Sequence, residues 1–590
     1  MPVVTLDKAD LYDRLGKQYS KEEFDQLCFE FGIELEEDSE DEPPVLVDGV
    51  PERATLKIDI PANRYDLLCL EGIALALNIF LEREKVPQYK LVDPPSGKHV
   101  LTIHPDTESL RPYAAAAVLR GVKLDKRRYE SFIALQDKLH ANLCRGRSLV
   151  AIGTHDLSTI QGPFTYEAPK PEDIHFVPLN QSEEMDGNRL MEFYSGHRVL
   201  SKFLPLIRDS PVYPVIYDAN RTVCSLPPII NSNHSKITLD ARDIFIECTA
   251  TDKTKLEVVL NIVVAMFSQY AEQPFTVEPV EIRSEHNGCS RITPSIAARK
   301  HMAEVSYINS CTGLSQTPET ICKQLSRMSM EAVVSGDDTV EVSVPCTRAD
   351  ILHQCDIMED VAIAYGYNNL KKTFPNVATV GQPLPLGKLT DLIRREVAMA
   401  GFTECMPLIL CSREENFSFL RKTDDSMAVT LANPKTIEYQ ICRTSLLPGC
   451  LKTIRENRKH ALPIKVFEVS DVVFKNEALE RRANNERHFC AVMAGHVSSF
   501  EVIHGLLDRV MKMLSIKLID KDTEEAGYYI SEGDDATFFP GRNATVHVRL
   551  ERGVAVQQLG VFGVLHPEVM QNYDLPFSAS ALELNVEALL

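Results

Sequence analysis

The chain has 590 residues, which is too long for a single hydrophobic core, so we expect roughly three to five domains. Its composition is globular, and its formal net charge of −21 argues against nucleic-acid binding through overall charge, because neutralising phosphates requires Lys and Arg on the contacting face. The 15 cysteines contain no CxxC pair, which indicates reduced thiols rather than a disulfide framework.

The N-terminus shows no targeting signal. Asp7, Asp10 and Asp13 stand there without an apolar run, which fits neither a signal peptide nor a transit peptide. The most apolar run, 258–267, is interrupted by Asn261 and is too short to span a bilayer. We therefore expect a cytoplasmic protein without a membrane partner.

Local patterns predict an α+β unit near the N-terminus. Ser20 and Glu23 form a capping box that opens a helix. The alternating run 55–60 predicts a strand. Asn63 and Asp66 are then expected to cap a second helix that runs to about Glu84.

Strand-like runs mix with helices from 111 to about 283, which indicates a larger α+β domain. The strands are predicted at 114–119, 149–153, 215–217 and 244–248, and the helices at 129–143 and 255–272.

The next segment resembles a winged helix. A helix begins after Thr317 with Pro in its first turn, and strands at 331–334 and 340–344 flank a turn at Gly336. Further on, helices at 389–400 and 500–514 alternate with strands at 464–469, 489–493, 544–549 and 560–565.

Four carboxylates converge after the second of these wing strands. Asp356, Glu359 and Asp360 stand at i, i+3 and i+4, so they share one face of a helix that Asp356 opens, and Asp350 lies in the preceding loop. Like charges so close repel each other unless a cation joins them. An all-oxygen cluster suits a hard ion, and Mg²⁺ is the first candidate.

A second interpretation of the acidic cluster needs no metal. Asp356 and Glu359 also have the spacing of a capping box, and an acidic first turn favours the helix dipole. His353 and Cys355 are a weak zinc signal without a second pair. Spacing alone favours capping over metal binding.

Five motifs spread over the chain carry a family resemblance. They stand in the order found in the beta subunit of phenylalanine–tRNA synthetases (ligases) of the cytosolic, archaeal/eukaryotic type, which the chain resembles. The motifs are DIPANRYDLL at 59–68, VAIGTHD at 150–156, SLPPIIN at 225–231, the segment 347–367 that contains the four carboxylates, and FEVSD at 467–471.

The resemblance implies a multidomain α+β fold with a partner chain. It implies an N-terminal α+β structural domain at 1–92, a tRNA-editing domain at 98–285, a winged-helix-like Mg²⁺-binding module at 295–372, and a degenerate class II synthetase catalytic-like domain, an antiparallel sheet with helices, at 385–590. Two alpha and two beta subunits would form a heterotetramer that attaches Phe to tRNA(Phe), with ATP bound mainly by alpha.

The C-terminal region lacks the residues that adenylate chemistry needs. Residues 387–590 contain no Gly-rich segment ending in an active-site Arg, and 467–469 stands where the catalytic motif would place an Arg for the ATP phosphates. We therefore expect no aminoacylation residues here, and Arg443 and Arg542 have no assigned contacts.

In the family that the chain resembles, the four carboxylates bind Mg²⁺ near the alpha-subunit interface. The resemblance therefore favours a structural or interfacial Mg²⁺ ion at Asp350, Asp356, Glu359 and Asp360 over capping alone.

The resemblance also implies proofreading. An apolar pocket rejects an added hydroxyl by only about a hundredfold, so an enzyme for Phe gains from a second, hydrolytic site that recognises Tyr through a buried acceptor. Glu247 and Thr249 share one face of a predicted strand that the resemblance places in this pocket, and Glu247 is the first choice for the acceptor.

Four further residues are expected to line the editing cleft and orient the ester and a water molecule. The competing interpretation of Glu247 is an ion-pair partner, and that of His155, which we favour over a general base, is a buried or capping histidine. The four residues are Thr154, His155, Ser225 and Asn231.

Two other functions remain open at this point. One is a scaffold or tRNA-binding subunit whose editing pocket is inactive. The other, a DNA-binding regulator, is disfavoured because 356–364 carries no Lys or Arg to reach a groove.

Overall fold

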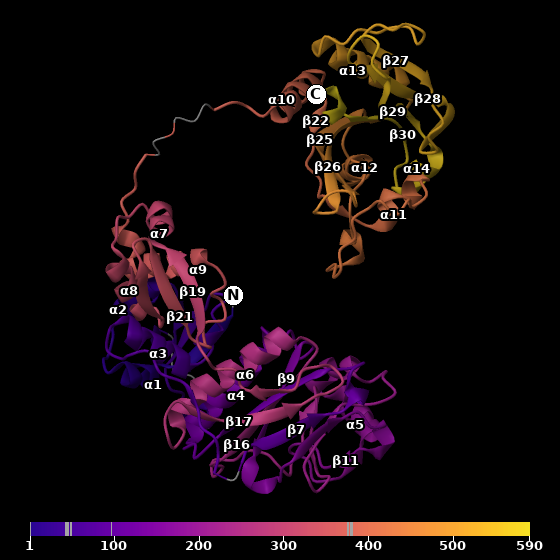
Figure 1. Ribbon diagram of the computed structural model, residues 1–590. Coiled ribbons are helices and arrows are strands. Elements are labelled where there is room, and N and C mark those ends of the chain that lie inside the picture. Colours follow the sequence, from indigo (N-terminus) through magenta and orange to yellow (C-terminus); the bar gives the residue numbers. More distant parts are fainter. Residues whose placement is uncertain (1, 42–45, 48–49, 96, 375–376, 378–380) are drawn as a thin grey trace. The chain divides into compact units, whose positions relative to one another are not determined.

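The structure is a computed structural model that describes all residues except 1, 42–45, 48–49, 96, 375–376 and 378–380. The chain forms two compact units, Met1–Phe374 and Pro375–Leu590 (Figure 1). Both units combine helices with β-sheet, which confirms the mixed α+β, multidomain fold. Among the described residues, no helix has the length and apolar character needed to cross a membrane.

The first unit opens with a small sheet in the order β1–β5–β2, packed with three helices. The predicted capping box of Ser20 and Glu23 is confirmed at the start of α2. The second helix begins only at Leu70, because Asp66 binds the guanidinium of Arg64 instead of capping it. The elements are β1 (Val3–Asp7), α1 (Lys8–Leu15), α2 (Lys21–Phe31), β2 (Glu34–Asp38), β3 (Leu46–Val47), β4 (Val50–Pro51), β5 (Thr55–Asp59) and α3 (Leu70–Phe80).

An eleven-stranded sheet forms the centre of the first unit. Its order is β15–β14–β13–β10–β7–β17–β8–β16–β9, and β6 and β18 also pair with β17. The strands are β6 (Lys90–Leu91), β7 (His99–Ile103), β8 (Tyr113–Leu119), β9 (Val150–Asp156), β10 (Phe164–Glu167), β13 (Val215–Tyr217), β14 (Val223–Leu226), β15 (Ile230–Asn231), β16 (Ile244–Ala250), β17 (Thr276–Arg283) and β18 (Arg291–Thr293).

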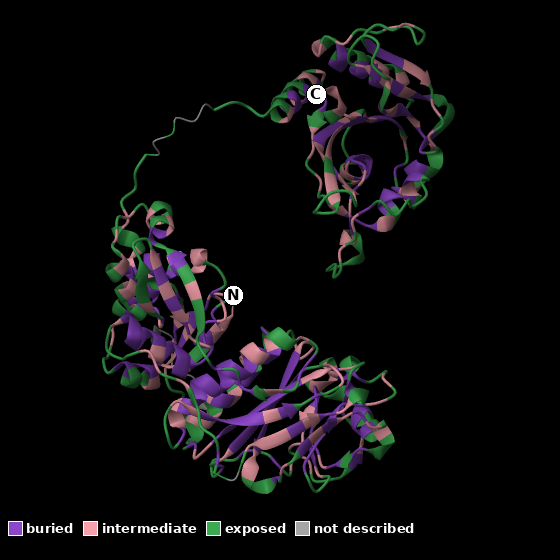
Figure 2. Cartoon of the chain, in the orientation of Figure 1, coloured by how far each residue is buried: buried purple, intermediate pink, exposed green. Residues whose placement is uncertain are grey.

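Two helices cover β8, β9 and β16. They are α4 (Lys126–Ala141) and α6 (Lys253–Phe267), and Figure 2 shows the buried residues concentrated on these strands and on α6. In the register of the sheet, Glu247 of β16 lies opposite Gly153 of β9 and Ala116 of β8. A small subdomain adds β11 (His175–Phe176), β12 (Met185–Asp186) and α5 (Gly187–Phe193).

A three-stranded antiparallel sheet, ordered β19–β21–β20, follows with three helices. The acidic helix α9 begins at Gln354, not at Asp356. Its capping box pairs His353 with Asp356, so the box predicted for Asp356 and Glu359 is wrong by three positions. The elements are β19 (Arg299–Glu304), α7 (Val305–Thr312), α8 (Pro318–Arg327), β20 (Glu331–Gly336), β21 (Thr339–Val344) and α9 (Gln354–Tyr365).

The second unit contains a seven-stranded sheet in the order β22–β25–β26–β30–β29–β28–β27. Its two faces have separate hydrophobic cores, one with α10 and α13 and one with α12 and α14. The elements are α10 (Pro385–Met399), β22 (Thr403–Glu404), β23 (Leu410–Cys411), α11 (Arg413–Asn416), β24 (Ile441–Cys442), α12 (Leu447–Glu456), β25 (Ile464–Lys475), β26 (Ala483–Gly495), α13 (Phe500–Met513), β27 (Gly527–Glu532), β28 (Phe538–Arg549), β29 (Gln557–Leu565), α14 (Pro567–Asn572) and β30 (Ser578–Asn585).

Candidate functional site

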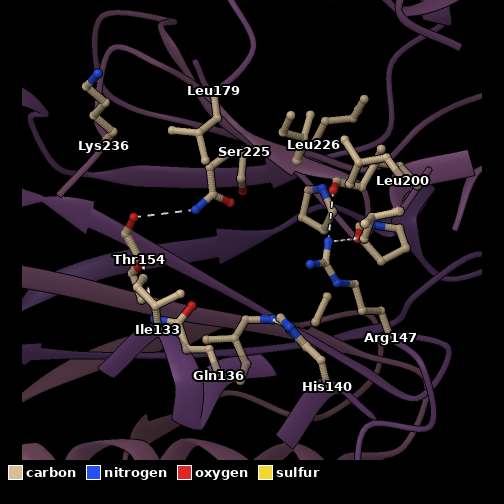
Figure 3. Close-up of a pocket in the computed structure, with 18 of the residues that line it drawn as sticks. Ile133, Gln136, His140, Arg147, Thr154, Leu179, Leu200, Ser225, Leu226 and Lys236 are labelled. Atoms are coloured by element: carbon tan, nitrogen blue, oxygen red, sulfur yellow. Dashed lines mark hydrogen bonds between the residues drawn. The ribbon is translucent and has the colours of Figure 1, made fainter. Parts of the chain in front are cut away.

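A cavity of about 520 Å³ lies in the first unit and is lined by both edge strands of the large sheet, β9 and β15 (Figure 3). Apolar side chains such as Ile133, Leu200 and Leu226 form much of its wall, as is typical of sites for small organic groups. Polar side chains converge on it from β9, β14, β15 and β16. Four of the predicted site residues line it: Thr154, Ser225, Asn231 and Glu247.

Glu247 offers a carboxyl oxygen to this cavity. Only 1% of the residue is exposed, and its Oε1 accepts a hydrogen bond of 2.7 Å from Ser225 Oγ. Its Oε2 is buried and has no hydrogen-bond partner among the described residues. Because an unsatisfied buried acceptor is costly, this oxygen is a natural binding point for a donor on a ligand.

The backbone opposite Glu247 has no side chain. A Cβ atom on Gly153 would lie 2.0 Å from Glu247 Oε1 and 3.1 Å from His155 Nε2. Because such a contact is sterically impossible, the glycine leaves the space into which the carboxyl group folds.

His155 and Thr249 are close to Glu247 but do not line the cavity. His155 is fully buried, its Nδ1 lies 2.8 Å from Ser235 Oγ, and its Nε2 lies 3.8 Å from Glu247 Oε1. This placement agrees with a buried core histidine. Thr249 Oγ1 accepts a hydrogen bond of 3.3 Å from Arg111 Nε, which gives it a supporting position behind the strand.

Thr154 and Asn231 join two edges of the cavity. The side-chain amide of Asn231 donates to the carbonyl oxygen of Thr154 at 3.5 Å (Figure 3). Gln136 of α4 donates to Thr154 Oγ1 at the same distance. The cavity wall is therefore held by hydrogen bonds between the helix and both strands.

His140 and Arg147 also line the cavity and were missed by the sequence reasoning. Periodicity places His140 within a predicted helix and gives no sign that its ring reaches a cavity. The one local signal for the position of Arg147 is Gly146, which stands between two arginines just after this helix. Glycine there is typical of a tight turn with positive φ angles.

The acidic cluster is organised by an arginine that the sequence reasoning overlooked. Arg348 donates to both carboxyl oxygens of Asp350, with Nη2–Oδ2 at 2.8 Å, and to Asp360 Oδ2 at 2.6 Å. Burial alone would raise the pKa of Asp350, but hydrogen bonds and charge from Arg348 bring it below its ordinary value. Stronger burial keeps the pKa of Asp360 above its ordinary value despite the same guanidinium.

Three carboxylates of the predicted magnesium site have protein partners in this structure, and the site itself stays a prediction. Asp350 and Asp360 are already bound by Arg348, and Asp356 Oδ2 accepts the backbone N–H groups of Leu352 and His353. Within the part of the chain that the structure describes, no group of three or more His, Cys, Asp or Glu side chains is placed to hold a metal ion. Glu359 is exposed to solvent.

Four family models match successive parts of the chain. The B1 domain of the Phe-tRNA synthetase beta subunit matches residues 1–83, the B3/4 domain matches 112–271, the tRNA synthetase B5 domain matches 302–367, and the CLM domain of the phenylalanyl-tRNA synthetase beta chain matches 370–586. The cavity around Glu247 lies largely within the B3/4 match.

Full-length relatives decide the family. The phenylalanine–tRNA ligase beta subunit of Schizosaccharomyces pombe is 59% identical over 99% of both chains, and that of Saccharomyces cerevisiae is 53% identical over 100% of both. The chain belongs to the phenylalanine–tRNA ligase beta subunit family. A crystal structure of an N-terminal fragment of the phenylalanyl-tRNA synthetase beta subunit from Pyrococcus horikoshii is 28% identical, with a TM-score of 0.56, and covers 62% of this chain and 99% of that fragment.

In this beta-subunit family member, Arg443 does not project from the second unit. Its Nη2 donates to Glu468 Oε1 at 2.7 Å, and its Nε donates to the carbonyl oxygen of Asp471 at 3.2 Å. Burial raises the pKa of Glu468 to about 7 despite this arginine. Arg443 is therefore a buried partner of Glu468, with only 2% of the residue exposed.

Proposed function

We propose that the chain works as the beta subunit of a phenylalanine–tRNA ligase of two alpha and two beta subunits. With alpha it supports the ATP-dependent attachment of Phe to tRNA(Phe), and in its own cavity it hydrolyses Tyr-tRNA(Phe). The observation that carries the second role is the unpaired, buried Oε2 of Glu247 in a cavity within the B3/4 region.

The need for a hydrolytic site follows from the chemistry of the two amino acids. Phe and Tyr differ by one hydroxyl, and an apolar synthetic pocket excludes the larger one by only about a hundredfold. A second site that binds the hydroxyl can discriminate strongly, because Phe leaves its buried acceptor unpaired.

Glu247 and Ser225 have the arrangement that such discrimination requires. Ser225 occupies one carboxyl oxygen and fixes the orientation of the group. The phenolic O–H of a tyrosyl group would donate to the other oxygen, whereas a phenylalanyl group offers no donor.

Hydrolysis in this cavity uses a positioned water and the substrate itself. The four predicted residues that line it offer two hydroxyls, an amide and one carboxyl group, and His155 is buried away from it. This set contains no Ser–His–Asp or Cys–His nucleophile, and the one hydroxyl bonded to a carboxylate, Ser225, serves to orient Glu247. The residues of the chain therefore bind and orient the aminoacyl ester, and the adjacent ribose hydroxyl assists the attack of water.

Replacing Glu247 tests this role directly. In the assembled ligase, Glu247→Ala should lower the preference for hydrolysing Tyr-tRNA(Phe) over Phe-tRNA(Phe) by about 5- to 150-fold, the equivalent of one buried hydrogen bond worth ~1–3 kcal/mol. Deacylation of each purified aminoacyl-tRNA measures this preference.

Two further variants serve as controls for the Glu247 experiment. Glu247→Gln keeps an acceptor oxygen and should retain part of the selectivity, and Glu192→Ala removes an exposed carboxylate of the same domain and should change nothing. Wild-type selectivity in Glu247→Ala would remove this residue from the site. If the wild-type complex deacylated neither aminoacyl-tRNA, the alternative function would hold, in which the chain is a scaffold with an inactive pocket.

An exposed apolar segment of the second unit supports the assembly with alpha. Met406, Leu408 and Ile409, between β22 and β23, are 88%, 66% and 48% exposed. Contiguous exposed apolar side chains mark protein–protein contacts. We assign this segment to the alpha subunit.

Leu408→Asp should therefore weaken assembly with alpha by at least about tenfold, because it places a charge in a desolvated contact. Titration of labelled beta with alpha, followed by mass determination, measures the effect. Val497→Asp, at an equally exposed apolar residue elsewhere in the same unit, is the matched control. Equal effects of the two variants would refute the assignment.

The complex uses ATP and Mg²⁺, and ATP is bound mainly by alpha. The assignment of ATP to alpha is supported by the internal pairing of Arg443. We place the complex in the cytoplasm, where the Arabidopsis thaliana relative is located according to its name.

A further inference from the structure

The turn that follows α4 has an unusual backbone. Arg145, Gly146 and Arg147 have φ values of 48°, 60° and 64°, so three successive residues lie in the left-handed region. This conformation costs about 1–2 kcal/mol for each non-glycine residue, and it persists only where surrounding contacts hold it. Arg111 provides such contacts, since its Nη1 donates to the carbonyl oxygens of Arg147 and Ser148 at 3.1 Å.

The strained turn directs the side chain of Arg147 to the cavity around Glu247. Its Nη1 donates to the carbonyl oxygens of Pro228 and Ile229 at 3.3 and 2.9 Å, and its guanidinium stacks 4.4 Å from the ring centre of Phe203. Figure 3 shows these two hydrogen bonds on one side of the guanidinium, with its other terminal nitrogen directed to the interior of the cavity.

His140 supplies a second donor to the same cavity. Its Nε2 accepts the backbone N–H of Ile152 at 3.0 Å, which places the proton of the neutral ring on Nδ1. His140 lines the cavity and is only 7% exposed. Its Nδ1 is buried and has no hydrogen-bond partner among the described residues. Burial, together with the charges of Arg147 and Arg111, lowers the pKa of His140 to about 3, so the ring stays neutral.

We infer that Nδ1–H of His140 and the inward guanidinium nitrogen of Arg147 form a donor pair for the ester carbonyl oxygen of the aminoacyl group. The inference rests on the proposed editing function and adds the group that stabilises its transition state. Fixed donors aimed at developing negative charge are the strongest single aid to acyl transfer.

The chemical step balances without any further reactant. Water attacks the ester carbonyl carbon, the electron pair of the C=O bond moves to the carbonyl oxygen, and the donor pair stabilises the resulting oxyanion. Collapse of this intermediate breaks the bond to the ribose oxygen, which takes up the proton that the water has released. The products are free tyrosine and tRNA with its terminal hydroxyl restored.

Two substitutions at His140 separate the donor role from the structural role. His140→Gln can still accept the N–H of Ile152 at the position of Nε2 but loses the donor at Nδ1. His140→Asn places an amide donor near the position of Nδ1 but loses the acceptor for Ile152. A purely structural histidine would therefore tolerate Gln better than Asn, and a donor would tolerate Asn better than Gln.

The experiment is single-turnover hydrolysis of Tyr-tRNA(Phe) by the assembled ligase over a range of enzyme concentrations. Removing one such donor should lower the rate at saturation by about 100-fold in His140→Gln. Half-saturation should be unchanged, and His140→Asn should be faster than His140→Gln. Arg147→Met should give a similar loss, and charging of tRNA(Phe) with Phe should remain at the wild-type level in all variants.

Three outcomes would overturn the inference. His140→Asn slower than His140→Gln would assign the ring to backbone support alone. If half-saturation required a higher enzyme concentration while the rate at saturation stayed unchanged, the pair would be assigned to a contact with the bound substrate, such as a tRNA phosphate, and not with the transition state. Unchanged hydrolysis in both His140→Gln and Arg147→Met, with an active wild type, would refute the pair and leave the proposed function intact.

Discussion

Arg348→Met should lower the free energy of unfolding of the first unit by about 3–5 kcal/mol, the cost of removing one partner from a buried charge cluster. The guanidinium holds Asp350 and Asp360 together and also donates to the carbonyl oxygen of Met328 at 3.0 Å. Without it, two carboxyl groups whose side chains are 5% exposed lose the guanidinium that pairs with them, and only the more distant charge of Arg64 is known to act on both. Urea unfolding of the full chain, followed by circular dichroism, measures the change.

A matched variant distinguishes this cluster from an ordinary ion pair. Arg283→Met breaks a pair with Glu281 on the surface of the same unit and should leave the free energy of unfolding nearly unchanged, because solvent screens the pair. Adding Asp350→Asn and Asp360→Asn to Arg348→Met should recover part of the loss, because neutral amides no longer need a counter-charge. Equal losses in Arg283→Met and Arg348→Met would contradict the account.

Removal of metal ions tests whether the acidic cluster also binds a metal. With Arg348 in place, a chelator should leave the unfolding transition of the isolated wild-type chain unchanged. A stabilisation by Mg²⁺ that disappears in Asp350→Asn would show that a metal ion shares the cluster with Arg348.

Gly153→Val should abolish most of the hydrolysis of Tyr-tRNA(Phe) while Phe attachment continues. The new Cβ would lie 2.0 Å from Glu247 Oε1, so the carboxyl group would have to leave its hydrogen bond with Ser225. A displacement of about 1 Å in a positioned group can cost about 100-fold in rate. Deacylation by the assembled ligase measures the loss.

Gly196→Ala is the control for the steric argument. This exposed glycine belongs to the same domain, and a Cβ there would meet no atom within 4 Å. Its deacylation rate should equal that of the wild type. Wild-type rates in Gly153→Val would show that Glu247 does not need its present position.

The local elements were predictable where one short pattern decides the conformation. The capping box at Ser20 and the strand Val215–Tyr217 are found as predicted. The short strands β7, β10 and β14 were not predicted, because strands of four or five residues carry little periodicity and gain their stability from neighbours distant in the sequence.

The acidic cluster shows what spacing alone leaves undecided. Asp350, Asp356 and Asp360 have the spacing of a shared ion site, but spacing carries no information about a cation two residues away that folds back on them. Arg348 lies two residues before Asp350 in the sequence and reaches Asp360 only because α9 packs beside its loop. The cation was in the sequence, and its contacts depend on the packing.

For the cavity, the sequence alone supported the family, the strand that carries Glu247 and four of the residues that line the site. These depend on motifs and on alternation along one strand, which are local properties. The tertiary structure decided that His155 and Thr249 stand behind the wall, that Gly153 makes room for Glu247, and that His140 and Arg147 face the cavity. Sheet register and helix packing join residues far apart in the chain and so leave no mark in any short stretch of it, and the left-handed turn at 145–147 has Gly146 as its one local sign.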